Sequence, residues 1–119
     1  MANITLINNA SIVTLDFNFN TPQQFFYTVE VVDDMLKQYF HDSGQWGGKI
    51  SFNLGIASNL IGKYLNIYWV IIDPVGAGNP YDGTGTISQA GVAVPLIQEC
   101  SGTSSNITSL VTTSGKFTI

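Results

Sequence analysis

Residues 63–73 have the sequence KYLNIYWVIID, one of the two strongest strand signals in the chain. Tyrosine, tryptophan, isoleucine and valine are the residue types enriched in β-strands, and from Tyr68 onward this stretch is apolar at consecutive positions. A strand that is apolar at consecutive positions presents an apolar surface on both of its faces. We therefore predict a central strand here, with the rest of the chain supplying its neighbours.

The flanking segments have the pattern of strands that are buried on one side only. Residues 12–20, IVTLDFNFN, alternate between apolar and polar side chains, as in an antiparallel strand with one wet face. Short runs of the same kind are found at residues 3–9, 49–56, 85–89, 91–100, 106–113 and 116–119. Many short strands separated by turn residues predict a mainly β fold, an antiparallel β-sandwich formed as a single domain over residues 1–119.

Residues 21–44 fit two structures. Thr21 and Pro22 suit the start of a helix, and apolar residues then recur at alternating spacings of four and three, with Leu36 on the apolar face. This pattern predicts one helix around residues 22–41, laid on the sandwich. The alternative is a strand over FFYTVEVV, which is rich in β-branched and aromatic residues and is followed by Asp33 and Asp34.

The charge content excludes one class of partner. Only 10% of the 119 residues are charged, arginine is absent, and four lysines stand against eight acidic residues, so the net charge is −4. A nucleic-acid-binding protein needs clustered basic residues, and these lysines are scattered singly along the sequence. A surface built of Asn, Thr, Ser, Gln and Gly repels copies of itself weakly, so we expect a homo-oligomer and no nucleic acid.

Nothing in the sequence has the spacing of a catalytic or cofactor site. Cys100 and His41 are each the sole residue of their type, and no G-x-S-x-G motif is present. The glycines between residues 76 and 85 lack the G-x-G-x-x-G spacing, and Asp82 is not part of a calcium-loop ladder. We expect a protein that is not an enzyme and that carries no cofactor and no metal.

The first residues, MANITLINN, lack the basic start and apolar stretch of a secretory signal. We expect a protein made without a cleaved signal peptide, which is stored as a cytoplasmic inclusion or released from the cell. Residues 54–72 are the most membrane-like stretch, but Lys63 lies at its middle and argues against a transmembrane helix.

What the sequence does offer is aromatic and amide side chains suited to recognition. Tyr68 and Trp69 point to opposite faces of their strand, so we expect one in the core and the other exposed. Tyr81 lies among Asn, Pro and Gly in the loop after that strand, where packing does not explain an aromatic ring. The expected contact residues are Trp46, Tyr68, Trp69, Asn79, Tyr81 and Asp82.

The stretch IYWVIIDPVGAGNPYDG, residues 67–83, resembles the strand and loop of aegerolysin-like proteins, where an aromatic strand ends in an Asn/Asp-Pro turn and continues as Gly-x-Asn-x-Tyr-Asp-Gly. It is especially similar to the small partner of the binary insecticidal crystal proteins. The resemblance implies a non-enzymatic β-sandwich that binds membrane lipids and acts with a larger pore-forming protein in a toxin system.

Two other functions stay open. A chain of low charge with an unpaired edge strand also suits a self-assembling structural subunit of a filament or crystalline inclusion. A small lectin is the third reading, with a glycan bound by Trp46, Asn79, Tyr81 and Asp82. Binding to liposomes would favour the first function, and a large assembly without any ligand would favour the second.

Overall fold

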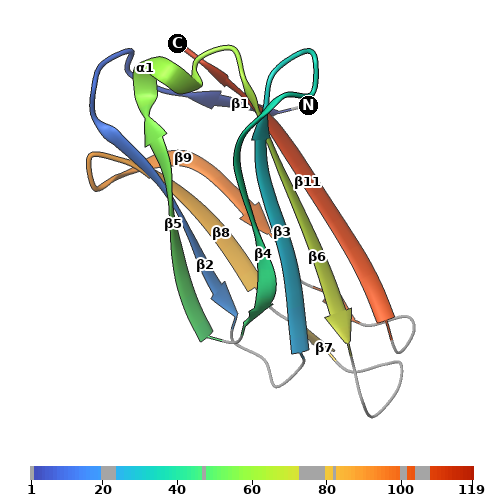
Figure 1. The fold of residues 1–119 in the computed structure, drawn as a ribbon. Helices are drawn as coiled ribbons and strands as arrows, with labels where there is room; N and C mark the ends of the chain where they lie inside the picture. The colour runs from blue at the N-terminus through green and yellow to red at the C-terminus, as the bar shows by residue number, and fades with distance from the viewer. Residues whose placement is uncertain are drawn as a thin grey trace.

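The computed structural model describes residues 2–19, 24–46, 48–72, 80–81, 83–99, 102–103 and 108–119. Two sheets face each other as the two layers of a sandwich (Figure 1). The mainly β, sandwich-like fold expected from the sequence is confirmed.

The first sheet has five strands in the order β1-β11-β6-β3-β4. Their bounds are β1 (Ala2–Thr5), β11 (Thr108–Thr118), β6 (Tyr64–Ile72), β3 (Gln24–Val32) and β4 (Gln38–Trp46). Neighbours are antiparallel except for β1 and β11, which run parallel.

The second sheet has the order β5-β2-β8-β9 and is antiparallel throughout. Its strands are β5 (Gly48–Ile56), β2 (Ile12–Phe19), β8 (Gly83–Gln89) and β9 (Val92–Glu99). A short pair is formed by β7 (Pro80–Tyr81) and β10 (Gly102–Thr103), and a single turn of helix, α1 (Ala57–Leu60), follows β5.

β6 is the central strand of the five-stranded sheet, as predicted. The inward positions Leu65, Ile67, Trp69 and Ile71 are at most 1% exposed. Its other face is only partly covered, because Tyr68 is 38% exposed on the outer side of the sheet. The apolar run therefore marks one buried face and one half-buried face.

The two layers are joined through aromatic rings around Phe17 of β2. Its ring centroid lies 5.9 Å from that of Tyr27 in β3, 5.3 Å from that of Trp69 in β6 and 5.1 Å from that of Phe52 in β5. Tyr27 and Trp69 belong to one sheet, and Phe17 and Phe52 belong to the other. The tilted and edge-to-face geometry is the one that aromatic rings prefer, so these contacts hold the layers face to face.

The helix predicted around residues 22–41 is wrong. Residues 24–46 form the β3–β4 hairpin, and the alternative reading of FFYTVEVV as a strand is confirmed. Tyr27, Val29 and Val31 are buried at every second position. β-Branched residues favour this extended form, and pairing with β6 satisfies the backbone along the whole of β3. Thr21 and Pro22, the expected start of the helix, lie outside the described residues.

One smaller expectation is also corrected. Residues 106–113 and 116–119 were predicted as separate strands, but β11 runs without a break through Thr113, Ser114 and Gly115. All three residues continue the ladder with β6, opposite Ile67, Asn66 and Leu65. Turn-forming residue types therefore did not produce a turn where a neighbouring strand was available.

Four segments lie towards one end of the sandwich, which we call the α1 end (Figure 1). Hydrogen bonds tie two of them together, because the backbone N–H groups of Ala57 and Ser58 donate to the carbonyls of Ser11 and Asn9, each at 2.9 Å. The α1 end consists of α1, the β1–β2 loop (residues 6–11), the β3–β4 turn (residues 33–37) and the β8–β9 turn (residues 90–91), together with the strand ends and chain terminus that adjoin them (residues 12, 38–39, 61–64, 92 and 116–119).

Candidate functional site

Two of the expected contact residues, Tyr68 and Trp69, are separated by their strand. Tyr68 is 38% exposed on the outer face of the five-stranded sheet, whereas Trp69 has 0% exposure and its ring packs against Phe17. The expected division into one exposed and one core residue is therefore confirmed. Trp69 has no surface with which to touch a ligand, so its expected contact role is corrected to a core role.

Of the other four expected contact residues, Trp46 and Tyr81 have a described backbone, which lies at the end opposite to α1. Trp46 is the last residue of β4, and Tyr81 is in β7, where its backbone pairs with Gly102 of β10. Asn79 and Asp82, like the side chains of Trp46 and Tyr81, lie outside the described part of the chain. Their role in binding stays a prediction.

Exposed apolar side chains gather at the α1 end instead. Nine large hydrophobic residues are exposed among the described side chains. Two of them, Phe26 and Tyr68, lie on the five-stranded sheet. The other seven lie on the loops and strand ends of the α1 end: Ile7, Ile12, Met35, Leu36, Tyr39, Val92 and Ile119. Single exposed apolar residues are normal on a protein surface, but a concentration of them marks an interaction site.

The β3–β4 turn is shaped by one carboxylate. Asp33 Oδ1 accepts hydrogen bonds from the backbone N–H groups of Met35 and Lys37 at 2.9 and 3.0 Å, and Asp33 Oδ2 accepts one from the Tyr39 hydroxyl at 3.0 Å. These bonds, above all the one from Lys37, lower the pKa of the Asp33 carboxyl. The turn is thus held by hydrogen bonds that leave Met35 89% and Leu36 78% exposed.

Leu36 also has an unfavourable backbone conformation. Its φ is 63°, in the left-handed region that glycine and asparagine normally occupy. For other residues this region costs about 1–2 kcal/mol. A large apolar side chain is therefore displayed to solvent at a position where a glycine would be more stable. Such outliers occur preferentially at functional sites.

Cationic groups surround the same turn. The Nζ atoms of Lys63 and Lys37 lie 4.4 and 5.3 Å from the centroid of the Tyr39 ring. Lys63 Nζ also donates a hydrogen bond to the carbonyl of Asn59 in α1. The ring attracts both ammonium groups through its negative face, so charge, aromatic ring and apolar side chains lie within one surface.

A third lysine belongs to this end. Lys116 Nζ lies 5.5 Å from the ring centroid of Tyr64, where β11 and β6 pair. Lys49, near the start of β5, lies at the opposite end of the sandwich. Three of the four lysines of the chain are therefore at the α1 end, although the sequence scatters them over residues 37, 63 and 116.

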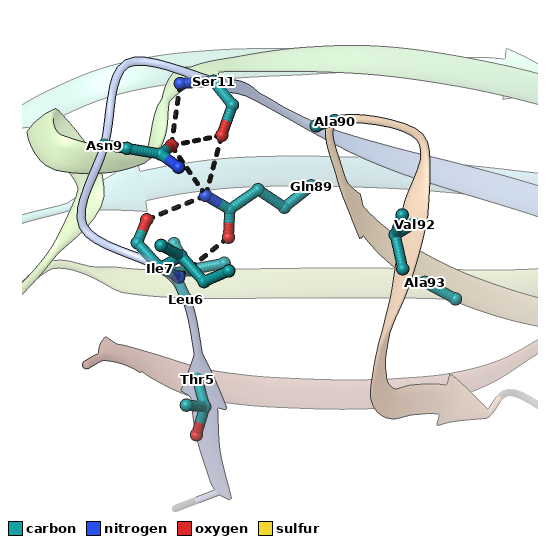
Figure 2. A pocket seen from close by; sticks show the side chains of 9 residues that line it. All are labelled: Thr5, Leu6, Ile7, Asn9, Ser11, Gln89, Ala90, Val92 and Ala93. Atoms are coloured by element: carbon teal, nitrogen blue, oxygen red, sulfur yellow. Dashed lines mark hydrogen bonds between the residues drawn. The ribbon is translucent and has the colours of Figure 1, made fainter.

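Besides its backbone bonds to α1, the β1–β2 loop is held by the amide side chain of Gln89 at the end of β8 (Figure 2). Gln89 Oε1 accepts a hydrogen bond from the Ile7 N–H at 2.9 Å. Gln89 Nε2 lies within hydrogen-bond distance of the Ile7 carbonyl (2.8 Å), Ser11 Oγ (2.8 Å) and Asn9 Oδ1 (3.1 Å). Only 9% of Gln89 is exposed. Alternation along β8 is the one sequence signal that indicates Gln89, because Gln89 shares the inward face of the strand with Gly85 and Ile87.

Beside this network lies a pocket of about 390 Å³. Figure 2 shows Leu6 and Ile7 on one side of it and Val92 and Ala93 on the other. The described residues that line it are Thr5, Leu6, Ile7, Asn9, Ser11, Gln89, Ala90, Val92 and Ala93. None of these described residues is charged or aromatic.

Two features are absent from the part of the chain that the structure describes. Within it, no three His, Cys, Asp or Glu side chains are grouped so that they could hold a metal ion. Within it, too, no helix is long and apolar enough to cross a membrane.

Comparisons with protein families, with curated proteins and with solved structures found no match for this chain. The resemblance of residues 67–83 to aegerolysin-like proteins stays a prediction.

Proposed function

We propose that this protein binds the surface of a lipid membrane with its α1 end, as a non-enzymatic component of a toxin system. The observation that carries the proposal is the β3–β4 turn. It holds Met35 and Leu36 almost fully exposed, and Leu36 does so in a left-handed conformation. Exposure of these apolar side chains to water is unfavourable, whereas their burial at the boundary between headgroups and acyl chains is favourable.

The surroundings of the turn suit the same interface. Tyrosine is enriched at the headgroup level of membranes, and lysine can bury its aliphatic stem while its ammonium group stays among the headgroups. Tyr39 is 51% exposed between the ammonium groups of Lys37 and Lys63. The neighbouring Asp33 directs its carboxylate to N–H and O–H groups of its own turn. We therefore propose anionic lipids as the preferred surface, although the whole chain carries a net charge of −4.

Orientation follows from this choice of end. With the α1 end on the membrane, the opposite end points away from it (Figure 1). β6 ends there, and the stretch that resembles aegerolysin-like proteins, residues 67–83, begins within β6. A larger pore-forming partner, which the resemblance implies, would then meet the protein on the side away from the lipid.

Co-sedimentation with vesicles tests the proposal. We would use phosphatidylcholine vesicles with and without phosphatidylserine, and compare the wild type with the double variant Met35→Asp/Leu36→Asp. The matched control is Phe26→Asp/Tyr68→Asp, which places the same two charges on exposed apolar residues away from the α1 end. We expect the wild type and the control to sediment with the anionic vesicles and the double variant to stay in solution. A wild type that ignores both kinds of vesicle, or a double variant that binds fully, would contradict the proposal.

One observation favours self-assembly as a second function. β4 is an outer strand of the five-stranded sheet, and its residues Gln38, Tyr39, His41, Ser43, Gly44 and Gln45 are exposed. An edge strand offers unpaired backbone groups to a second copy. Light scattering without lipid separates the two functions, because a very large assembly that ignores vesicles would support the structural subunit. A lectin function would depend on side chains outside the described residues.

A further inference from the structure

We propose that the pocket beside Gln89 binds the hydrocarbon chain of a membrane lipid. The inference rests on the proposed function and goes beyond it, because it assigns a second, chain-binding site next to the surface-binding turn. A volume of about 390 Å³ falls within the range of roughly 300–1,000 Å³ that is typical of small-molecule pockets.

The lining selects for an uncharged aliphatic ligand. Leu6 and Ile7 line the pocket on one side, and Val92 and Ala93 line it on the other (Figure 2). Among the described residues that line it there is no lysine and no acidic residue, so an ionised group would lose its water without gaining a charged partner from them. None of these described residues offers an aromatic ring on which a sugar face would stack.

The polar groups at the side of the pocket are already engaged with one another. The Gln89 amide bonds to both backbone groups of Ile7 and to the side chains of Asn9 and Ser11. Asn9 Oδ1 accepts further hydrogen bonds from the N–H and the hydroxyl of Ser11. Because these groups satisfy one another, a ligand is not needed to complete them, and contact with the aliphatic side chains remains as the source of affinity.

The position of the pocket fits a chain supplied by the bilayer. Ile7 and Val92 on its two sides are 70% and 73% exposed, and both belong to the α1 end. The β1–β2 loop bonds to α1, since Ser58 N–H donates to Asn9. The pocket therefore lies on the same end that carries Met35 and Leu36, so a protein seated by the turn brings the pocket to the lipid surface.

The test distinguishes binding of the lipid's hydrocarbon chain from binding of its headgroup. ¹⁵N-labelled protein is titrated with dihexanoylphosphatidylcholine below its micelle-forming concentration, and separately with glycerophosphocholine, which has the same headgroup without chains. We expect saturable shifts of the amide signals of residues 6–11 and 89–93 with the first compound and none with the second. Equal shifts with both compounds would overturn the chain site, because the headgroup alone would then account for binding.

Two variants distinguish this inference from the proposed function. Val92→Asp places a carboxylate at the pocket, and we expect it to weaken binding of the short-chain lipid by about tenfold or more. Since Val92 is 73% exposed, the fold should tolerate the change. Met35→Asp should keep short-chain lipid binding and lose vesicle binding.

The outcomes point to different failures. Vesicle binding by the wild type without any saturable shift at the pocket would overturn the chain site and leave the membrane surface standing. Saturable shifts at the pocket without vesicle binding would keep the chain site and overturn the membrane function. Val92→Asp binding the short-chain lipid as tightly as the wild type does would also overturn the chain site.

Discussion

The β3–β4 turn and the β1–β2 loop lie at the same end of the molecule, and each is held by one polar side chain of opposite character. In the turn, the charged and partly exposed Asp33 bonds to groups at most six residues away. In the loop, the neutral and buried Gln89 bonds to residues 78–82 positions away. The turn is a local structure attached to the sandwich, whereas the loop is built into it.

This difference separates binding from stability. Changes in the turn should alter what the protein touches and leave the fold in place, because Met35 and Leu36 contribute little to the core. Changes at Gln89 should weaken the fold itself, because a buried network that loses one member leaves several groups without partners. Substitutions in the turn and at Gln89 should therefore affect vesicle binding and the free energy of unfolding separately.

Gln89→Leu should lower the free energy of unfolding by about 2–4 kcal/mol. The variant removes all hydrogen bonds of the amide and leaves both backbone groups of Ile7 without it. Urea unfolding of the two proteins measures the loss. Gln45→Leu, on the exposed side of β4, is the matched control and should change stability by no more than about 0.5 kcal/mol. Similar stability for both variants would show that the Gln89 network does not hold the loop.

Leu36→Gly should raise the stability of the protein and lower its binding to vesicles. Relief of the left-handed conformation should raise the free energy of unfolding by about 1 kcal/mol, while vesicle binding falls because the apolar side chain is gone. Ala90, with a φ of 52°, is the other non-glycine residue with positive φ in the described chain. Ala90→Gly should give a similar gain in stability, which would assign the gain to the backbone. A Leu36→Gly protein that binds vesicles like the wild type would contradict the role of the turn.

Lys63→Ala should weaken binding to phosphatidylserine-containing vesicles by a factor of about five, the equivalent of roughly 1 kcal/mol for one lysine near an anionic surface. Added salt should reduce the difference between variant and wild type. Lys49→Ala removes the same charge at the opposite end and should bind as the wild type does. If the two variants lose affinity equally, the α1 end has no special role in attracting anionic lipid.

The smallest change that we expect is the response of the β3–β4 turn to low pH. The pKa of Asp33 is lower in the folded protein than in the unfolded chain, so its carboxylate stabilises the folded turn above the unfolded-state pKa. That contribution is lost as pH falls through the folded-state pKa. NMR signals of the Met35 and Lys37 amides should therefore shift at a pH below the usual aspartate range. In Asp33→Asn this acid transition should be absent, and its persistence would assign it to another group.

The sequence was sufficient for the layers of the fold but not for the hairpin between residues 24 and 46. Alternation in IVTLDFNFN and the apolar run around Trp69 are local signals of strands, and both strands were predicted. In residues 25–32, apolar side chains satisfy a helical spacing and a strand spacing together. Pairing with β6, a contact between segments distant in sequence, decided between them.

The candidate site was harder to predict for the same reason. A helix over residues 33–41 would have buried Leu36, so its display at a turn was not foreseen. Gln89 acts on residues 78–82 positions away, and three lysines that are scattered in sequence meet only once the sheets are formed. The division between Tyr68 and Trp69 was predictable, because opposite faces of a strand follow from alternation alone.

The most direct test asks which end of the sandwich enters the membrane. A polarity-sensitive nitrobenzoxadiazole label is attached to Met35→Cys at the α1 end or to Gln45→Cys towards the opposite end, each in a Cys100→Ser background. On addition of anionic vesicles, we predict a blue shift and a gain in emission for the label at residue 35 and none for the label at residue 45. A response only at residue 45, or at neither position, would contradict membrane binding through the α1 end.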